Sequence, residues 1–66
     1  MKTTIKDIKR GEWFTLKDIE NPTEMQVWIK DEYDRTEKAY WCQCFGDINK
    51  FRLFKGNKEV YTEFTF

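Results

Sequence analysis

Apolar residues occupy alternate positions in the stretch 25–33, and such alternation with a period of two is typical of β-strands. The neighbouring stretch 38–45 is rich in aromatic and other strand-favouring residues. The polar segment 34–37 separates the two stretches and begins with Asp34, a residue type that favours the first position of a type I turn. The pattern therefore predicts a β-hairpin as the central element of the chain.

The register of this hairpin decides which side chains share a face, because neighbouring side chains on a strand point to opposite sides. A two-residue or four-residue turn centred on Arg35 and Thr36 predicts the cross-strand pairs Tyr33–Lys38, Asp31–Tyr40, Ile29–Cys42 and Val27–Cys44. One face is then small and apolar and consists of Val27, Ile29, Cys42 and Cys44. The other face carries Trp28, Lys30, Trp41 and Gln43. A three-residue turn would exchange the faces of one arm.

The beginning of the chain predicts a short helical segment. Thr4 resembles a helix N-cap, and the carboxylate of Asp7 follows three residues later. Gly11 is suited to end the segment, so we expect one or two helical turns.

A first strand is expected before the hairpin, over residues 12–17. Its alternation places Phe14 and Leu16 on one face and Trp13 on the other. Residues 18–24 are polar and acidic and contain an Asn-Pro pair, which disfavours regular structure. We therefore expect a loop between this strand and the hairpin.

Residues 48–55 fit two patterns. Apolar residues recur every three positions between Asp47 and Gly56, a candidate cap and a candidate stop, which indicates a short helix. Phe51 and Leu53 also occupy alternate positions, and Gly56 with the residue after it suits a two-residue hairpin turn into the next strand. We favour the strand.

The remaining elements follow from the same rules. Gly46 and Asp47 are expected to close the second arm of the hairpin. A last strand is predicted over 60–66, with its apolar side chains directed inward: Val60, Phe64 and Phe66.

These elements predict a single, mainly β domain over residues 1–66. Four or five short strands with at most one short helical turn indicate a small antiparallel barrel, in which curling of the sheet protects its edges. Both an SH3-like and an OB-like barrel have this character. The SH3-like barrel of about five strands fits 66 residues better, because little chain is left over.

Composition narrows the possible partners. Twelve Lys and Arg residues balance twelve Asp and Glu residues, so no global field draws the chain to nucleic acid or to a membrane. No apolar run approaches the roughly 20 residues that span a bilayer, and the N-terminus is too polar for a signal peptide. We therefore expect a cytoplasmic protein without a membrane partner. The C-terminal part of the chain nevertheless indicates a local basic strip, because the cations of residues 38–58 outnumber the one carboxylate there, Asp47. These cations are Lys38, Lys50, Arg52, Lys55 and Lys58.

The cysteines are expected to be core residues. Cys42 and Cys44 lie two apart on one strand, which is poor geometry for a mutual disulfide and fits a reducing compartment. A zinc site needs four ligands, and the chain has no histidine and no second cysteine pair. Unless two copies share a site, we expect no metal and no cofactor.

The sequence also predicts that the protein is not an enzyme. It lacks histidine as an acid or base at neutral pH, and its three glycines are too scattered for a phosphate-binding loop. The carboxylates of Asp31, Glu32 and Asp34 cluster near the hairpin tip, where they are better explained as a solvated charged group than as a catalytic pair.

A set of residues spread over nearly the whole chain carries a resemblance. It comprises Gly11, Phe14, Tyr33-Asp34-Arg35, Tyr40, Cys42, Asp47-Ile48-Asn49, Leu53, Lys55-Gly56, Val60-Tyr61 and Phe64-Thr65-Phe66. This pattern resembles a family of short uncharacterised proteins from gut anaerobic bacteria and their phages and mobile elements. The resemblance implies an accessory protein that handles DNA or partner proteins, and it implies no catalytic residue.

The tryptophans are the main functional signal. In the predicted register Trp13, Trp28 and Trp41 share the outer face with Lys30 and Gln43. Exposed aromatic residues interleaved with cations bind single-stranded nucleic acid by base stacking and phosphate pairing. The same face could instead bind another protein or a second copy, or the tryptophans could form a second small core. The predicted function is a binding module, with nucleic acid and protein as the two candidate partners.

Overall fold

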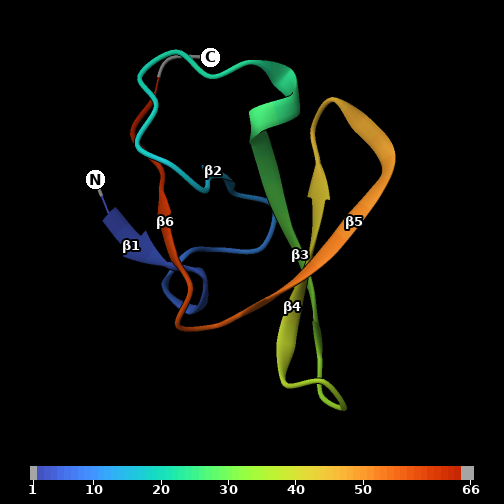
Figure 1. Ribbon diagram of the computed structural model, residues 1–66. Helices are drawn as coiled ribbons and strands as arrows, with labels where there is room; N and C mark the ends of the chain where they lie inside the picture. The colour runs from blue at the N-terminus through green and yellow to red at the C-terminus, as the bar shows by residue number, and fades with distance from the viewer. Residues whose placement is uncertain (1, 65–66) are drawn as a thin grey trace.

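The computed structural model describes residues 2–64, and it is mainly β. Six antiparallel strands form one sheet in the order β1-β6-β2-β3-β4-β5 (Figure 1). Their bounds are β1 (Lys2–Thr4), β2 (Trp13–Thr15), β3 (Val27–Asp34), β4 (Ala39–Cys44), β5 (Asp47–Lys55) and β6 (Glu59–Tyr61). The helical content consists of two 3-10 turns, η1 (Ile5–Asp7) and η2 (Glu24–Gln26). The sheet is not closed, since no pairing joins β5 to β1 within residues 2–64.

The central hairpin, β3 and β4, is present as the sequence predicts (Figure 1). Its loop is four residues long, since Asp34 pairs with Ala39. The Asp34 Oδ1 atom accepts hydrogen bonds from the backbone N–H groups of Thr36 at 2.9 Å and Glu37 at 3.2 Å. Lys38 ends the loop in the left-handed region, with φ of 54°. The aspartate therefore opens the turn by accepting hydrogen bonds from the backbone of the loop.

The predicted register of the hairpin is wrong. Between Lys30 and Tyr33 the pairing of β3 with β4 shifts, so Trp28 lies opposite Cys44 and Lys30 opposite Cys42. Two residues of β3 stand there against one residue of β4, which is the arrangement of a β-bulge. The bulge reverses the predicted facing of the first arm, so that Trp28 and Lys30 share a face with the cysteines. That face packs on the core and is called the inner face below.

Two other predictions concern local segments. A helical turn after Thr4 is confirmed as η1, where the Thr4 hydroxyl donates a hydrogen bond of 2.6 Å to Asp7 Oδ2, but the turn ends at Asp7 and not at Gly11. Residues 48–55 belong to β5, so the strand interpretation is confirmed.

The predicted hairpin after residue 55 is wrong. A turn is present, with Lys58 donating its backbone N–H to the carbonyl oxygen of Lys55 at 3.0 Å. However, the strand that follows, β6, pairs with β1 and β2 instead of β5. The last strand is also shorter than predicted and ends at Tyr61; Val60 is buried and Phe64 half-buried, while Phe66 lies outside the described residues.

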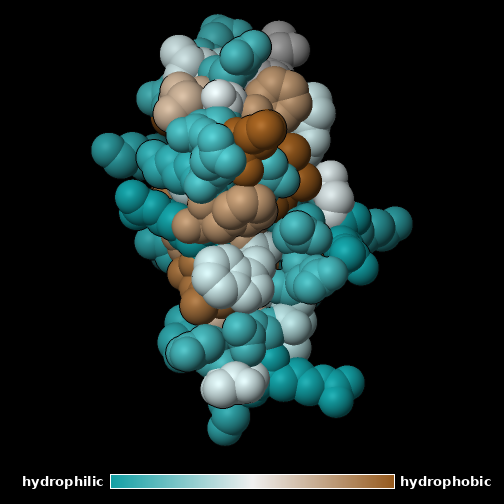
Figure 2. Space-filling view, turned by 90° about the vertical axis from the view of Figure 1, so that its right-hand side faces the viewer, coloured by the Kyte–Doolittle hydropathy of each residue, from teal (hydrophilic) through white to brown (hydrophobic). Residues whose placement is uncertain are grey.

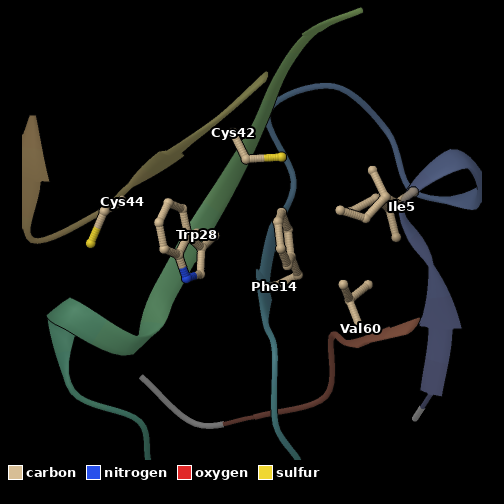
Figure 3. Close-up of a cluster of buried hydrophobic side chains, with 7 residues drawn as sticks. Ile5, Phe14, Trp28, Cys42, Cys44 and Val60 are labelled. Atoms are coloured by element: carbon tan, nitrogen blue, oxygen red, sulfur yellow. The ribbon is translucent and has the colours of Figure 1, made fainter. Parts of the chain in front are cut away.

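The core lies between the inner face of the sheet and η1. Its buried members are Ile5, Ile8, Phe14, Trp28, Cys42, Cys44 and Val60. Figure 3 shows Phe14 between Trp28 on one side and Ile5 with Val60 on the other. Phe54 of β5 meets both Phe14 and Trp28 edge-on, with ring centroids 6.2 and 5.5 Å apart. From β4 the core receives the small side chains of Cys42 and Cys44, and Tyr40 packs against its margin.

Candidate binding face

The five residues predicted to form a binding face are divided between the two sides of the sheet. Trp28 and Lys30 are buried on the inner face, with exposed fractions of 5% and 7%. Trp13 and Trp41 are 41% and 37% exposed, and Gln43 is half-buried. The prediction that the three tryptophans share one face is therefore wrong. Two of them remain accessible to a partner, and the third belongs to the core.

Lys30 has a structural role in place of the predicted role beside a ligand. Its ammonium group donates a hydrogen bond of 2.6 Å to the carbonyl oxygen of Ile8 and lies 4.3 Å from the ring centroid of Tyr40. A buried ammonium requires such partners, because burial without them costs several kcal/mol. Lys30 thus ties β3 to the segment after η1, and it is not available to a phosphate.

The outer face of the sheet carries a row of side chains that the register places side by side. Trp13 pairs with Ile29, Ile29 with Gln43, and Gln43 with Phe51, so the row crosses β2, β3, β4 and β5. Trp41 and Leu53 form the next outer pair. Phe45 joins the row through its ring, which lies 4.9 Å from the ring of Trp13. We call this set the aromatic face: Trp13, Ile29, Trp41, Gln43, Phe45, Phe51 and Leu53.

Several members of the aromatic face are open to solvent. Phe51 is 48% exposed, and neighbouring Ile48 is more exposed still. Figure 2 shows the side of the molecule on which β5 lies, where tan and brown apolar side chains form a band among teal polar ones. Exposed apolar side chains that gather in this way mark interaction sites more often than single exposed residues do.

Two cations of β5, Lys50 and Arg52, lie on the other side of the strand from the aromatic face, whereas Lys55 lies on the same side as Leu53. Arg52 pairs with Cys42 of the inner face, and the cationic groups of Lys50 and Arg52 lie 5.7 and 6.0 Å from the ring centroid of Trp28. Near the hairpin tip, Trp41 donates its indole N–H to Asp34 Oδ2 at 3.2 Å. The charged group beside the outer tryptophan is therefore a carboxylate, which repels phosphate.

A shallow hollow of about 220 Å³ lies next to Trp28. It is lined by Leu16, Lys17, Ile19, Gln26 and Trp28. Leu16, Lys17 and Ile19 belong to the segment that follows β2, while Gln26 lies in η2 and Trp28 in β3. The sequence missed this hollow, since it forms only because the loop returns over the tryptophan.

The carboxylates at the hairpin are engaged in surface contacts. Arg10 lies 3.5 Å from Asp31 and 3.5 Å from Glu32, and all three side chains are substantially exposed. Asp34 binds the turn and Trp41, as described above. Exposed ion pairs of this kind contribute little to stability, and the arrangement fits a solvated charged group.

Both cysteines are free, buried thiols in the core. Burial raises the pKa of the Cys42 thiol from 9.0 to about 11. Within residues 2–64, no group of three or more potential ligands is arranged to hold a metal ion. A neutral, enclosed thiol is a poor nucleophile, because the thiolate is the reactive form.

The raised pKa of Cys42 predicts a loss of stability at alkaline pH. In the unfolded chain this thiol ionises near pH 9.0, whereas in the folded chain it ionises only near pH 11. Its contribution to stability is thus complete below pH 9 and is lost as the pH rises through 11, by at most about 1.4 kcal/mol per pH unit. Unfolding in urea at several pH values should show a steeper alkaline decline for the native sequence than for Cys42→Ala. Equal slopes would contradict the assignment.

No protein-family model matches the chain, and neither a curated protein nor a solved structure matches it. The resemblance to short proteins of gut anaerobes and phages therefore stays a prediction. Among residues 2–64, no helix is long and apolar enough to cross a membrane.

The sequence missed Phe51, Phe45 and Leu53 as members of the candidate face. Alternation in 50–53 indicated that Phe51 and Leu53 share one side of a strand, but it could not show which strand lies beside them. That neighbour is β4, and the pairing brings them next to Gln43 and Trp41.

Proposed function

We propose that this protein is a non-enzymatic binding module whose aromatic face binds a protein partner. The observation that carries the proposal is the exposure of Trp13, Trp41 and Phe51 on one side of a single sheet. Aromatic residues are enriched in the buried centre of protein interfaces, and they supply much of the binding energy there. The half-buried Ile29, Phe45 and Leu53 provide an apolar surround for such a centre.

The distribution of charge favours a protein over nucleic acid as the partner of this face. The row of paired residues from Trp13 to Phe51 contains no Lys or Arg, and Asp34 lies against Trp41. A nucleic-acid platform needs cations near its stacking residues to neutralise phosphates. Lys30, the cation predicted on the same face as the tryptophans, is buried and engaged on the inner face.

Single-stranded nucleic acid is the second candidate, and one observation favours it. Lys50 and Arg52 flank Phe51 in the sequence, so an exposed ring and two cations meet along β5. Binding of this type would weaken steeply with salt, whereas binding at the aromatic face would depend much less on ionic strength. Titration of tryptophan fluorescence with oligo(dT) at two salt concentrations separates the candidates.

Phe51→Ser is expected to weaken the binding of peptides that recognise the aromatic face. Peptides selected from a random display library against the native protein should lose about 1–3 kcal/mol of affinity for this variant, because the aromatic anchor is gone. Tyr33→Ser is the matched control, since Tyr33 is about as exposed as Phe51, at 50%, but lies on the other face of the sheet. Tyr33 pairs with Tyr40 and Tyr40 with Phe54, and Phe54 packs on the core. Peptides that bind both variants as well as the native protein would refute the proposal.

At the level of the fold, we propose an SH3-like arrangement. The antiparallel meander from β2 to β5, with β6 on the remaining edge of β2, supports this proposal. An experimental structure in which the sheet lies flat, without curling over the core, would argue against it.

A further inference from the structure

We propose that the free edge of β5 binds an extended peptide with alternating acidic and apolar residues, which adds to the sheet as a seventh strand. The inference deepens the proposed function by naming the class of partner, and it rests on that function. The sheet has two edge strands of very different length. One edge is β1, with three residues, and the other is β5, with nine.

The backbone of β5 is suited to receive another strand. Its segment from Phe51 to Lys55 makes five consecutive pairs with β4 and has no irregularity. Among residues 2–64, no strand pairs with its other side. An edge strand presents unpaired N–H and C=O groups on that side, and an extended peptide can bind them by strand addition. Proteins usually blunt such an edge by keeping it short, as this chain does at β1.

The side chains of β5 specify what kind of strand fits. On the inner side Lys50 and Arg52 are two residues apart, and on the outer side so are Phe51 and Leu53. A strand added alongside presents its own side chains alternately to the same two sides. Acidic residues would then lie opposite the cations, while apolar residues would extend the aromatic face. Cross-strand pairs of both kinds stabilise a sheet.

The same pattern disfavours two of the registers in which a second copy of the chain could pair with β5. Antiparallel pairing of β5 with its own copy, centred on Phe51, places Arg52 opposite Lys50 of the second copy. Centring on Arg52 places two arginines opposite each other. Like charges directly across a ladder are destabilising. Nucleic acid is a poorer fit as well, because phosphates offer no donors to the carbonyl groups along the edge.

The test uses the full chain, labelled with ¹⁵N, and a soluble peptide of about six residues that alternates Glu and Val, a common strand length. Upon addition of the peptide, hydrogen exchange should slow for alternate amides between residues 51 and 55. A peptide with Lys in place of Glu should bind on the order of tenfold more weakly, since both charge pairs are lost. A Glu-Val peptide methylated on alternate backbone nitrogens should not bind.

Charge reversal provides the decisive variant. Lys50→Glu with Arg52→Glu should reverse the preference, so that the Lys-Val peptide binds more tightly than the Glu-Val peptide. Because both cations lie near the ring of Trp28, Lys50→Gln with Arg52→Gln serves as a milder variant that should abolish the preference without reversing it. Circular dichroism would verify that each variant is folded.

The outcomes distinguish this inference from the proposed function. If peptides shift the signals of Trp13 and Trp41 but leave exchange in β5 unchanged, the edge proposal is overturned and the aromatic face stands. If library peptides ignore Phe51→Ser, the proposed function itself fails. Slow exchange in β5 without peptide, together with a dimer in sedimentation, would assign the edge to a second copy. Salt-sensitive binding of oligo(dT) through Lys50 and Arg52, without peptide binding, would overturn the inference in favour of nucleic acid.

Discussion

Trp28→Ala is expected to remove most of the stability of the fold. The indole is 5% exposed and packs edge-on against Phe54, with ring centroids 5.5 Å apart. Truncation of a large buried aromatic residue costs about 3–5 kcal/mol. Small domains have little stability in reserve, since the whole range for proteins is about 5–15 kcal/mol and 66 residues lie near its lower end. Urea unfolding followed by circular dichroism measures the loss.

Trp41→Ala is the matched control for this prediction. Trp41 is 37% exposed on the outer face, and its truncation removes a surface hydrogen bond to Asp34. We expect a change of stability within about 1 kcal/mol. If both variants lost the same stability, Trp28 could not be an inner-face residue and the bulged register would be wrong. The pair thus tests the register directly, because without the bulge the two tryptophans would share a face.

Signals confined to a few neighbouring residues allowed much of the fold to be predicted. Asp34 specifies the hairpin loop through its own side-chain hydrogen bonds, and Thr4 with Asp7 specifies η1 in the same way. The alternation of Phe51 and Leu53 favoured a strand for residues 48–55 over a short helix, and the segment is part of β5. Each of these features depends on local backbone preferences, which the sequence carries directly.

The facing of the hairpin was not predictable because it depends on one extra residue. A loop longer by two positions shifts the pairing without exchanging the faces, whereas a bulge shifts it by one and exchanges them. The bulge lies at Asp31 and Glu32, and the sequence has no glycine or proline there that would indicate a bulge. Val27 is buried in spite of the reversal, and so is Thr15, with which it pairs at the end of the ladder.

The candidate face depends on contacts between strands that are distant in sequence. Trp13 and Trp41 were predicted on the outer side from alternation alone, and their exposure agrees with that placement. Phe51 reaches the same face because β5 folds back along β4. The order of strands also decided the end of the chain. The turn after Lys55 is compatible with a hairpin, but the segment that follows it binds η1 instead. Ile5 of η1 donates its backbone N–H to the carbonyl oxygen of Lys58 at 3.1 Å.

Lys30→Met is expected to destabilise the fold while leaving binding at the aromatic face intact. Methionine preserves most of the side-chain volume but removes the donor to the carbonyl oxygen of Ile8 and the cation above Tyr40. A buried acceptor left without its partner costs about 1–3 kcal/mol. In a domain of this size each kcal/mol lowers Tm by about 4–8 °C. Thermal unfolding therefore gives a large and easily measured effect.

The comparison with Lys9→Met isolates the effect of burial, because Lys9 is an exposed lysine in the segment that Lys30 holds. Its substitution should change Tm little, since exposed positions without special contacts tolerate replacement within about 0.5 kcal/mol. Binding of the selected peptides, measured well below Tm, should be unchanged in both variants. If Lys30→Met kept the native stability but no longer bound the peptides, the ammonium group would lie at a ligand site, as the sequence alone suggested. That result would contradict the position of the Lys30 side chain on the inner face.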